Sequence, residues 1–243
     1  MHKFFRQTEA MTRAHTRLDR LAHMPIGGMA ALLCFALLDV FVVPFTTVPD
    51  GVPVRIAHDV LLSLVLLSGV AAVSDHRAQM MMLALVAGVA IVVRWAAWFL
   101  PSGLATGLRD ATALVSLGVL AVAIGIKVFG AGKVTLDRIR GAVVLYILIG
   151  VVWADAYQLL SLHIPGAFAG VPHAGNSPDR SVWIYYSFVT LTTVGYGDIT
   201  PVVHVARSLA IVEALIGQLY PAIVLARLVS LQVSGSGSSG NPS

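Results

Sequence analysis

Residues 192–198 read Thr-Thr-Val-Gly-Tyr-Gly-Asp and directly follow a short apolar run, Trp183 to Leu191. A helix needs about 20 residues to cross a bilayer, so the run predicts a re-entrant helix. In the segment after it, two glycines alternate with larger residues, and glycine adopts conformations that turn successive carbonyls to the same side. Stacked carbonyl oxygens from several subunits replace the hydration shell of a cation. The segment therefore predicts a cation-binding backbone at membrane depth.

The composition around this segment is that of an integral membrane protein. Hydrophobic residues make up 57% of the 243 and charged residues 12%, about half of the roughly 25% typical of a soluble domain. This balance excludes a disordered chain, a collagen-like repeat and a basic nucleic-acid-binding domain. The single cysteine, Cys34, provides neither a disulfide framework nor a cysteine-based metal cluster.

The apolar pattern predicts an all-α integral membrane fold with six transmembrane helices plus a short re-entrant helix and the loop that follows it. The six spans are expected at about 26–46, 57–75, 78–100, 108–130, 139–163 and 202–232. Most lysines and arginines fall on the same side as the N-terminus, which predicts that both termini are cytoplasmic. Short loops and the lack of an evident targeting peptide favour a bacterial inner (plasma) membrane.

Three segments outside the spans have compositions of their own. Residues 1–24 are basic and amphipathic, which predicts an interfacial helix on the anionic lipids of the inner leaflet. Residues 131–140 are expected to form an amphipathic linker along the same leaflet. Residues 234–243 are rich in glycine and serine, which predicts a flexible tail.

The stretch 192–198 resembles the signature sequence of potassium channels, and its setting between two full spans is that of the family. The resemblance extends over about 139–232 as outer helix, pore helix, filter and inner helix. It implies a pore domain over 141–233 and a four-fold symmetric homotetramer, so that three identical subunits are the partners. It also implies K+ ions in the filter without an organic cofactor. The ion-coordinating positions would be Thr193, Val194, Gly195 and Tyr196.

The resemblance also implies a set of residues that support the filter. These are Thr192, Gly197, Asp198, Trp183, Tyr185, Tyr186 and Val189. Family members often bond the aspartate at the outer mouth to an aromatic residue of the pore helix; Trp183 and Tyr186 are the candidates here, with Tyr185 in a supporting cuff. Val189 stands where some members carry a glutamate, which argues against glutamate-coupled inactivation.

On the last span, Gly217 matches the glycine that the family uses as a gating hinge, although a packing glycine is the alternative. Gln218, Pro221 and Leu225 follow at spacings of three and four, which predicts one stripe facing a cavity. Pro221 removes a helical hydrogen bond and is expected to kink the span.

Six spans with the pore last resemble the voltage-gated arrangement, in which the first four helices (here 25–130) form a sensor. A sensor needs regularly spaced arginines in the fourth span. That span, 108–130, carries Arg109 and Lys127 at its ends and no charge between them other than Asp110 beside Arg109. We therefore expect little or no voltage dependence.

Several charges lie within spans, where an ionised group is costly and usually paired or functional. Counting along the helices places Asp39 and Arg94 at similar depth, which predicts an ion pair. Asp155 is expected to pair with Arg207. For Glu213 we expect protein donors behind the filter rather than a position in the cavity.

The sequence thus predicts a potassium-selective channel without enzymatic activity, since His163 and His173 have no carboxylate or cysteine beside them. Three alternatives stay open: a less selective cation channel, a subunit of a potassium uptake transporter, and a non-conducting regulatory subunit. The opening stimulus is equally open among pH, lipid, tension, ligand and none.

Overall fold

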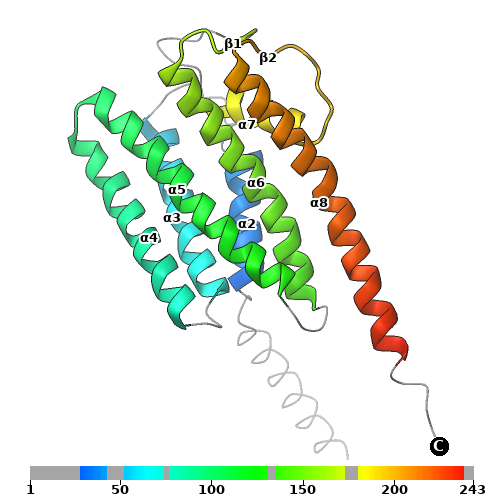
Figure 1. Cartoon of the computed structure of the whole chain (residues 1–243). Helices are drawn as coiled ribbons and strands as arrows, with labels where there is room; N and C mark the ends of the chain where they lie inside the picture. Colours follow the sequence, from blue (N-terminus) through cyan, green and yellow to red (C-terminus); the bar gives the residue numbers. More distant parts are fainter. Residues whose placement is uncertain (1–27, 43–51, 74–76, 131–134, 173–179, 238–243) are drawn as a thin grey trace, which may run out of the picture.

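The computed structural model describes residues 28–42, 52–73, 77–130, 135–172 and 180–237, which form a helical bundle (Figure 1). The helices are α2 (Gly28–Phe41), α3 (Val52–Ala72), α4 (Arg77–Ala96), the 3-10 turn η2 (Ala97–Phe99), α5 (Ser102–Phe129), α6 (Leu136–His163), α7 (Arg180–Leu191) and α8 (His204–Gly237). The expected interfacial helix at 1–24 lies outside the described residues.

Five of these helices are long and apolar enough to cross a membrane. The candidate spans are Arg55–Ala72, Arg77–Phe99, Gly107–Phe129, Leu136–His163 and His204–Arg227. The described part of α2 is apolar but has 14 residues, or about 21 Å of helix against a hydrocarbon core of about 30 Å. The chain is therefore an all-α, multi-pass membrane protein, and its sixth span stays a prediction.

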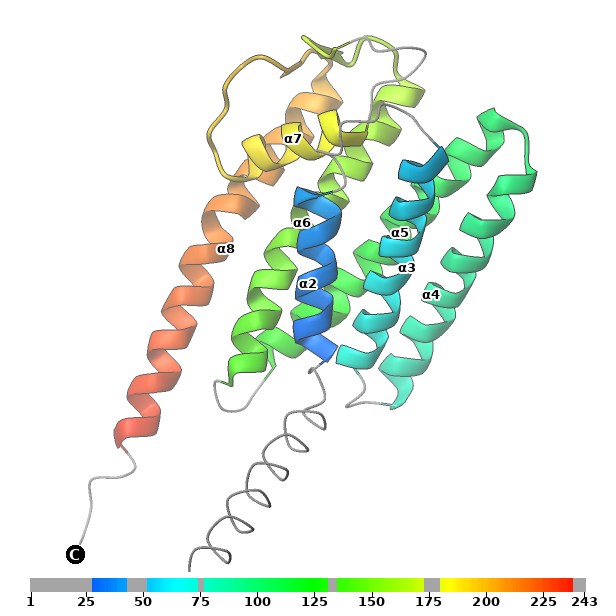
Figure 2. The ribbon, with the colours of Figure 1, turned by 180° about the vertical axis from the view of Figure 1, so that it is seen from behind.

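The helices share one continuous core. Helices α2 to α6 lie side by side, α8 runs along the edge of the molecule, and the short α7 lies at one end between α6 and α8 (Figures 1 and 2). Buried residues extend without a break from Met29 on α2 to Ala206 on α8. Within the described chain, α2 and α5 pack directly on α6, which in turn contacts α7 and α8. Helix α3 packs on α2 and α5, and α4 packs on α3 and α5.

Two helix boundaries differ from the expectation. Thr135 caps α6, because its side chain accepts a hydrogen bond from the backbone N–H of Arg138, and Asp137 adds a favourable charge in the first turn. Residues 136–140 therefore belong to α6 and not to a separate linker. At the other end of the chain α8 continues to Gly237, so the predicted flexible tail begins too early at 234.

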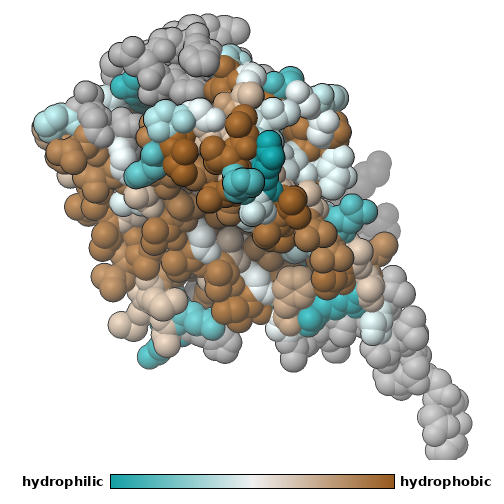
Figure 3. Space-filling model, turned by 45° about the horizontal axis from the view of Figure 1, so that its top comes forward, coloured by the Kyte–Doolittle hydropathy of each residue, from teal (hydrophilic) through white to brown (hydrophobic). Residues whose placement is uncertain are grey.

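Apolar side chains also cover the outside of the bundle (Figure 3). On α4 the large apolar residues that are exposed are Met81, Met82, Leu85, Val89, Val92 and Trp95. A soluble domain of this size rarely exposes such contiguous apolar surface, whereas lipid accommodates it. The outer surface therefore agrees with the membrane assignment.

Candidate functional site

The site is built at the end of α7, the helix expected to be re-entrant. Its residues Trp183, Ile184, Ser187 and Leu191 are buried at helical spacing and face the rest of the chain. The opposite face carries Tyr185, which is 40% exposed. One face of α7 is thus anchored in the core and the other is open.

The segment 192–198 leaves α7 with a backbone that alternates in handedness. Thr193, Gly195 and Gly197 have φ angles of 60°, 57° and 79°. Thr193 is the only non-glycine with positive φ among the described residues, and a β-branched side chain pays for this conformation with strain. Positive φ at every second residue is the geometry that turns successive carbonyls to one side.

Backbone hydrogen bonds tie this segment to the last turn of α7. The carbonyl of Thr190 accepts from the N–H of Thr193 at 2.9 Å. The carbonyl of Val189 accepts from both Val194 and Gly195, at 3.0 and 3.2 Å. Val189, which the sequence places among the residues expected to support the filter, thus contacts the segment 192–198 through its backbone carbonyl.

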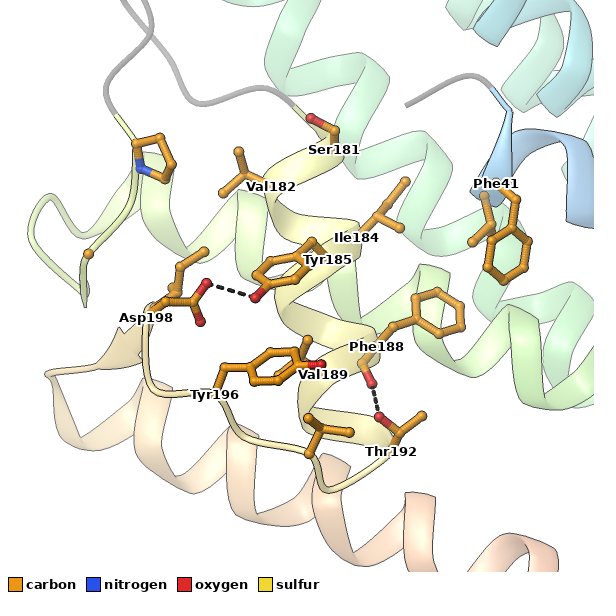
Figure 4. A pocket seen from close by; sticks show the side chains of 15 residues that line it. Phe41, Ser181, Val182, Ile184, Tyr185, Phe188, Val189, Thr192, Tyr196 and Asp198 are labelled. Atoms are coloured by element: carbon orange, nitrogen blue, oxygen red, sulfur yellow. Dashed lines mark hydrogen bonds between the residues drawn. The ribbon is translucent and has the colours of Figure 1, made fainter. Parts of the chain in front are cut away.

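The far end of the segment is held by a hydrogen bond from a tyrosine hydroxyl and by a small two-stranded sheet. The hydroxyl of Tyr185 donates to Asp198 Oδ2 at 2.7 Å, and the Tyr185 ring stacks on Tyr196 with an angle of 7° between the planes (Figure 4). Strands β1 (Phe168–Ala169) and β2 (Thr200–Pro201) pair just beyond Asp198. The segment is therefore fixed at both ends.

The aromatic partner of Asp198 is not one of the two candidates named from sequence. Trp183 packs on Phe168 with ring centroids 5.0 Å apart, and Tyr186 packs on Tyr157 at 4.9 Å. Both rings lie on the buried face of α7 and point away from the face on which Tyr185 meets Asp198. The rotation of α7 about its axis determines which of the three aromatic side chains faces Asp198. That rotation cannot be read from their order in the sequence.

The Tyr185 hydrogen bond lowers the pKa of Asp198 from its ordinary value. A carboxylate with a lowered folded-state pKa stabilises the fold above its unfolded pKa and loses that contribution as pH falls through the folded one. We expect Tyr185→Phe to lower the melting temperature of the purified protein slightly at pH 7, since the pair is exposed. The difference from wild type should shrink as pH falls below about 3.9, the ordinary pKa of aspartate.

Thermal unfolding over a pH series measures this effect. Tyr146→Phe is the matched control, because its hydroxyl makes no hydrogen bond within the described part of the chain. A difference between Tyr185→Phe and wild type that stays constant down to pH 3 would contradict the assignment.

An open groove of about 680 Å³ lies beside this segment (Figure 4). Its lining comes from α7, from the segment itself and from α2, where Phe41 faces Phe188 at 6.5 Å between ring centroids. Val194 and Tyr196 are 51% and 70% exposed beside it. The face of the segment that carries these apolar side chains has no cover within the described chain.

Helix α8 approaches the site through Gly217. A Cβ built on this glycine would lie 1.7 Å from the carbonyl oxygen of Leu191, the last residue of α7. Only a glycine permits this contact, so Gly217 is a packing glycine in this structure. Gln218, Pro221 and Leu225 are exposed on α8, and Pro221 lies inside the continuous helix.

Glu213 lies one turn before Gly217 and is fully buried behind the site. Tyr157 Oη donates to Glu213 Oε2 at 2.6 Å, and Glu213 Oε1 lies 2.5 Å from Ser187 Oγ. Ser187 Oγ also lies 2.7 Å from the carbonyl oxygen of Gly150, which can only accept. A serine hydroxyl has a single proton, so an ionised Glu213 would share that proton with the carbonyl of Gly150, whereas a protonated Glu213 can donate to Ser187 and leave both contacts as full hydrogen bonds.

Asp39, Arg94 and Asp155 each form an ion pair, but the partners expected from the sequence are wrong. Arg94 bonds to Asp59 at 2.5 Å, and Asp155 bonds to Arg180 at 3.2 Å. Arg207 instead donates to the carbonyl of Pro201. Counting residues gives depth along the helix axis, whereas pairing also depends on which face each side chain occupies.

Four side chains of this region were missed from sequence: His58, Tyr157, Arg180 and Ser187. Asp39 bonds to His58 and Arg180 rather than to Arg94. The available signal was the position of Arg180 directly before the apolar run, since an arginine at the start of a helix that enters the membrane needs carboxylate partners.

Comparison with known proteins agrees with this geometry. Residues 145–233 match the family model described as "Ion channel". Protein LctB of Bacillus caldotenax is 32% identical over 120 residues, which cover 48% of this chain and 89% of that protein. Protein LctB of Geobacillus stearothermophilus is 50% identical over 46 residues, which cover 19% of this chain and 34% of that protein.

Proposed function

The chain belongs to the ion channel family, and from this premise we propose that it forms a potassium-selective pore that conducts K+ passively. Family membership favours transport over catalysis. The bound species would be K+ ions, held by the backbone carbonyls of Thr193, Val194, Gly195 and Tyr196 and by the Thr193 hydroxyl, with no organic cofactor.

The observation that carries the proposal is the alternation of positive φ at Thr193, Gly195 and Gly197. A loop that only connected two helices would have no reason to hold a threonine in a strained conformation. A row of carbonyls aimed at one axis requires that conformation, and the hydrogen bonds to Val189 and Thr190 hold it.

One chain provides one row of carbonyls, so the proposal includes a homotetramer. Two observations support three further copies as partners. The groove beside Tyr196 exposes apolar side chains of the filter itself. In addition, only 11% of the apolar window of α8 is buried, against 50% for α6. Neighbouring copies packed in the groove and against α8 would cover both surfaces.

The remaining features of the proposal follow the sequence. Both termini would be cytoplasmic in a bacterial inner membrane, with the basic N-terminal segment on anionic lipids. The exposed stripe at Gln218, Pro221 and Leu225 would line the cavity, and bending of α8 near Gly217 would open it.

We propose little or no voltage dependence because the charges of α5 are fixed in place. Arg109 lies over the ring of Trp98 at 4.9 Å, and Lys127 donates to the carbonyl of Ala72. Neither charge lies in the middle of the helix, where displacement across the field would do work.

The test is the reversal potential of the purified full chain in planar bilayers under a potassium/sodium gradient. We expect reversal near the potassium equilibrium potential and an ohmic current at both signs of voltage. Reversal near zero would favour the less selective cation channel, and a steep conductance–voltage curve would contradict the account of α5. Absence of current from a well-assembled tetramer, at acidic and neutral pH and with anionic lipid, would favour a non-conducting subunit.

A further inference from the structure

Arg180 is the first residue of the pore helix α7, and its guanidinium lies beside polar side chains of three other helices of the same chain. Nε lies 3.2 Å from Asp155 Oδ1 on α6. Nη1 lies 3.3 Å from Asp39 Oδ2 on α2 and 3.3 Å from His58 Nδ1 on α3. The fork geometry of an arginine suits this task, because Nε and Nη1 reach carboxylates on two different helices, Asp155 and Asp39.

His58 completes the shell of Asp39. His58 Nδ1 lies 2.9 Å from Asp39 Oδ1. Nδ1 cannot both donate to Asp39 and accept from Arg180, and the shorter contact places the proton on Nδ1. Both oxygens of Asp39 are then hydrogen-bonded, one to His58 and one to Arg180.

The position of Arg180 needs this compensation. The N-terminus of a helix carries partial positive charge, so a cation there is unfavourable without anionic partners. Two buried carboxylates, one from α2 and one from α6, supply them. The neighbouring Arg94 already bonds to Asp59, which also accepts from Trp98 Nε1 at 2.9 Å, so Asp39 and Asp155 are left for Arg180.

Helix α7 connects this cluster rigidly to the filter. It has 12 residues, or about 18 Å, and the filter begins at the residue after its last one. A change at Arg180 therefore tilts or shifts the whole helix, and the filter moves with its other end. Asp39 enters this linkage from outside the pore helices, through its contacts with Arg180 and His58.

We propose that Arg180 is a positioning residue for the filter and that the first helices of the chain serve as a brace, which holds the pore helix through Asp39. This inference rests on the proposed potassium-selective function. In this account α2 and α3 hold the pore helix in position and so contribute to ion selectivity. In the voltage-gated arrangement, by contrast, the corresponding helices form a voltage sensor.

The test is the ratio of potassium to sodium permeability, taken from reversal potentials of the full-length channel in bilayers. We expect Arg180→Gln and Asp39→Ala each to lower the ratio by roughly tenfold, because a broken buried ion pair leaves a partner charge uncompensated. Arg180→Lys should retain part of the selectivity, since lysine keeps the charge but reaches only one carboxylate. A loss that affected folding alone would reduce the number of channels and leave the ratio unchanged.

Asp137→Ala is the matched control, because it removes an aspartate from an exposed pair with Arg140 near the start of α6. It should keep the wild-type ratio. Wild-type ratios in both Arg180→Gln and Asp39→Ala would overturn the inference. If neither variant yields channels, the permeability ratio is measured in Arg180→Lys, which retains the charge, and in Asp39→Asn, which retains the shape. Wild-type ratios in both of these would overturn the inference in the same way. A wild-type channel that itself reverses near zero would instead refute the proposed function.

Discussion

Replacing Gly217 with alanine is expected to reduce the potassium current by about tenfold or more. The channels that remain are expected to be less selective for potassium. The new Cβ would lie 1.7 Å from the carbonyl oxygen of Leu191, and a backbone carbonyl cannot rotate away as a flexible side chain would. Overpacking of this kind costs about 1–3 kcal/mol or more, and about 1.4 kcal/mol corresponds to a factor of ten. Either α8 or the end of α7 must move, and the filter begins at the next residue.

The measurement is current per mass of protein in bilayers, with assembly followed by size-exclusion chromatography. Gly88→Ala on α4 is the matched control, since nothing lies within 4 Å of a Cβ built there. If Gly217 acted as a hinge alone, alanine would change how often the channel opens and leave the permeability ratio intact. That result would contradict the packing role.

The second large effect concerns Glu213, where two substitutions distinguish the shape and hydrogen bonding of the side chain from its charge. Glu213→Gln is expected to conduct and select like wild type, because its amide N–H₂ donates to Ser187 and its oxygen accepts from Tyr157, as a protonated carboxyl does. Glu213→Ala is expected to lose most of the current. It leaves two buried hydroxyls without their partner, at about 1–3 kcal/mol each, directly behind α7.

Infrared spectroscopy tests the proton itself. The carbonyl band of a protonated carboxylic acid should be present in the wild type at neutral pH and absent in Glu213→Gln. Retained function in Glu213→Ala, or strong loss in Glu213→Gln together with no such band, would show that Glu213 is ionised or unimportant for the filter.

Sequence reasoning predicted the helical class and five of the spans because hydropathy is additive along a helix. A window of about 20 apolar residues has the same preference for lipid whatever surrounds it. The same holds for α7, whose nine-residue apolar core is too short to span. The observed start of α6 differs from the predicted one because a capping residue, Thr135, sets where the helix begins.

Pairing of the buried charges could not be predicted in this way. Asp39 and Arg94 are at similar depth, yet Arg94 faces Asp59 while Asp39 faces His58 and Arg180. The face that a side chain occupies depends on the rotation of each helix, and that rotation is set by packing with all its neighbours at once. The choice of Tyr185 over Trp183 and Tyr186 for Asp198 has the same origin.

The sequence by itself determined that this chain lies in a membrane as helices and carries one glycine-alternating segment between two of them. These properties depend on residue type and spacing along the chain, which are local. Only the tertiary structure decided that Gly217 contacts Leu191, that Glu213 is hydrogen-bonded to Tyr157 and Ser187, and that Arg180 joins α7 to α2 and α6. Each of these contacts joins residues far apart in sequence or on different helices, and their distance and facing exist only once the helices have packed.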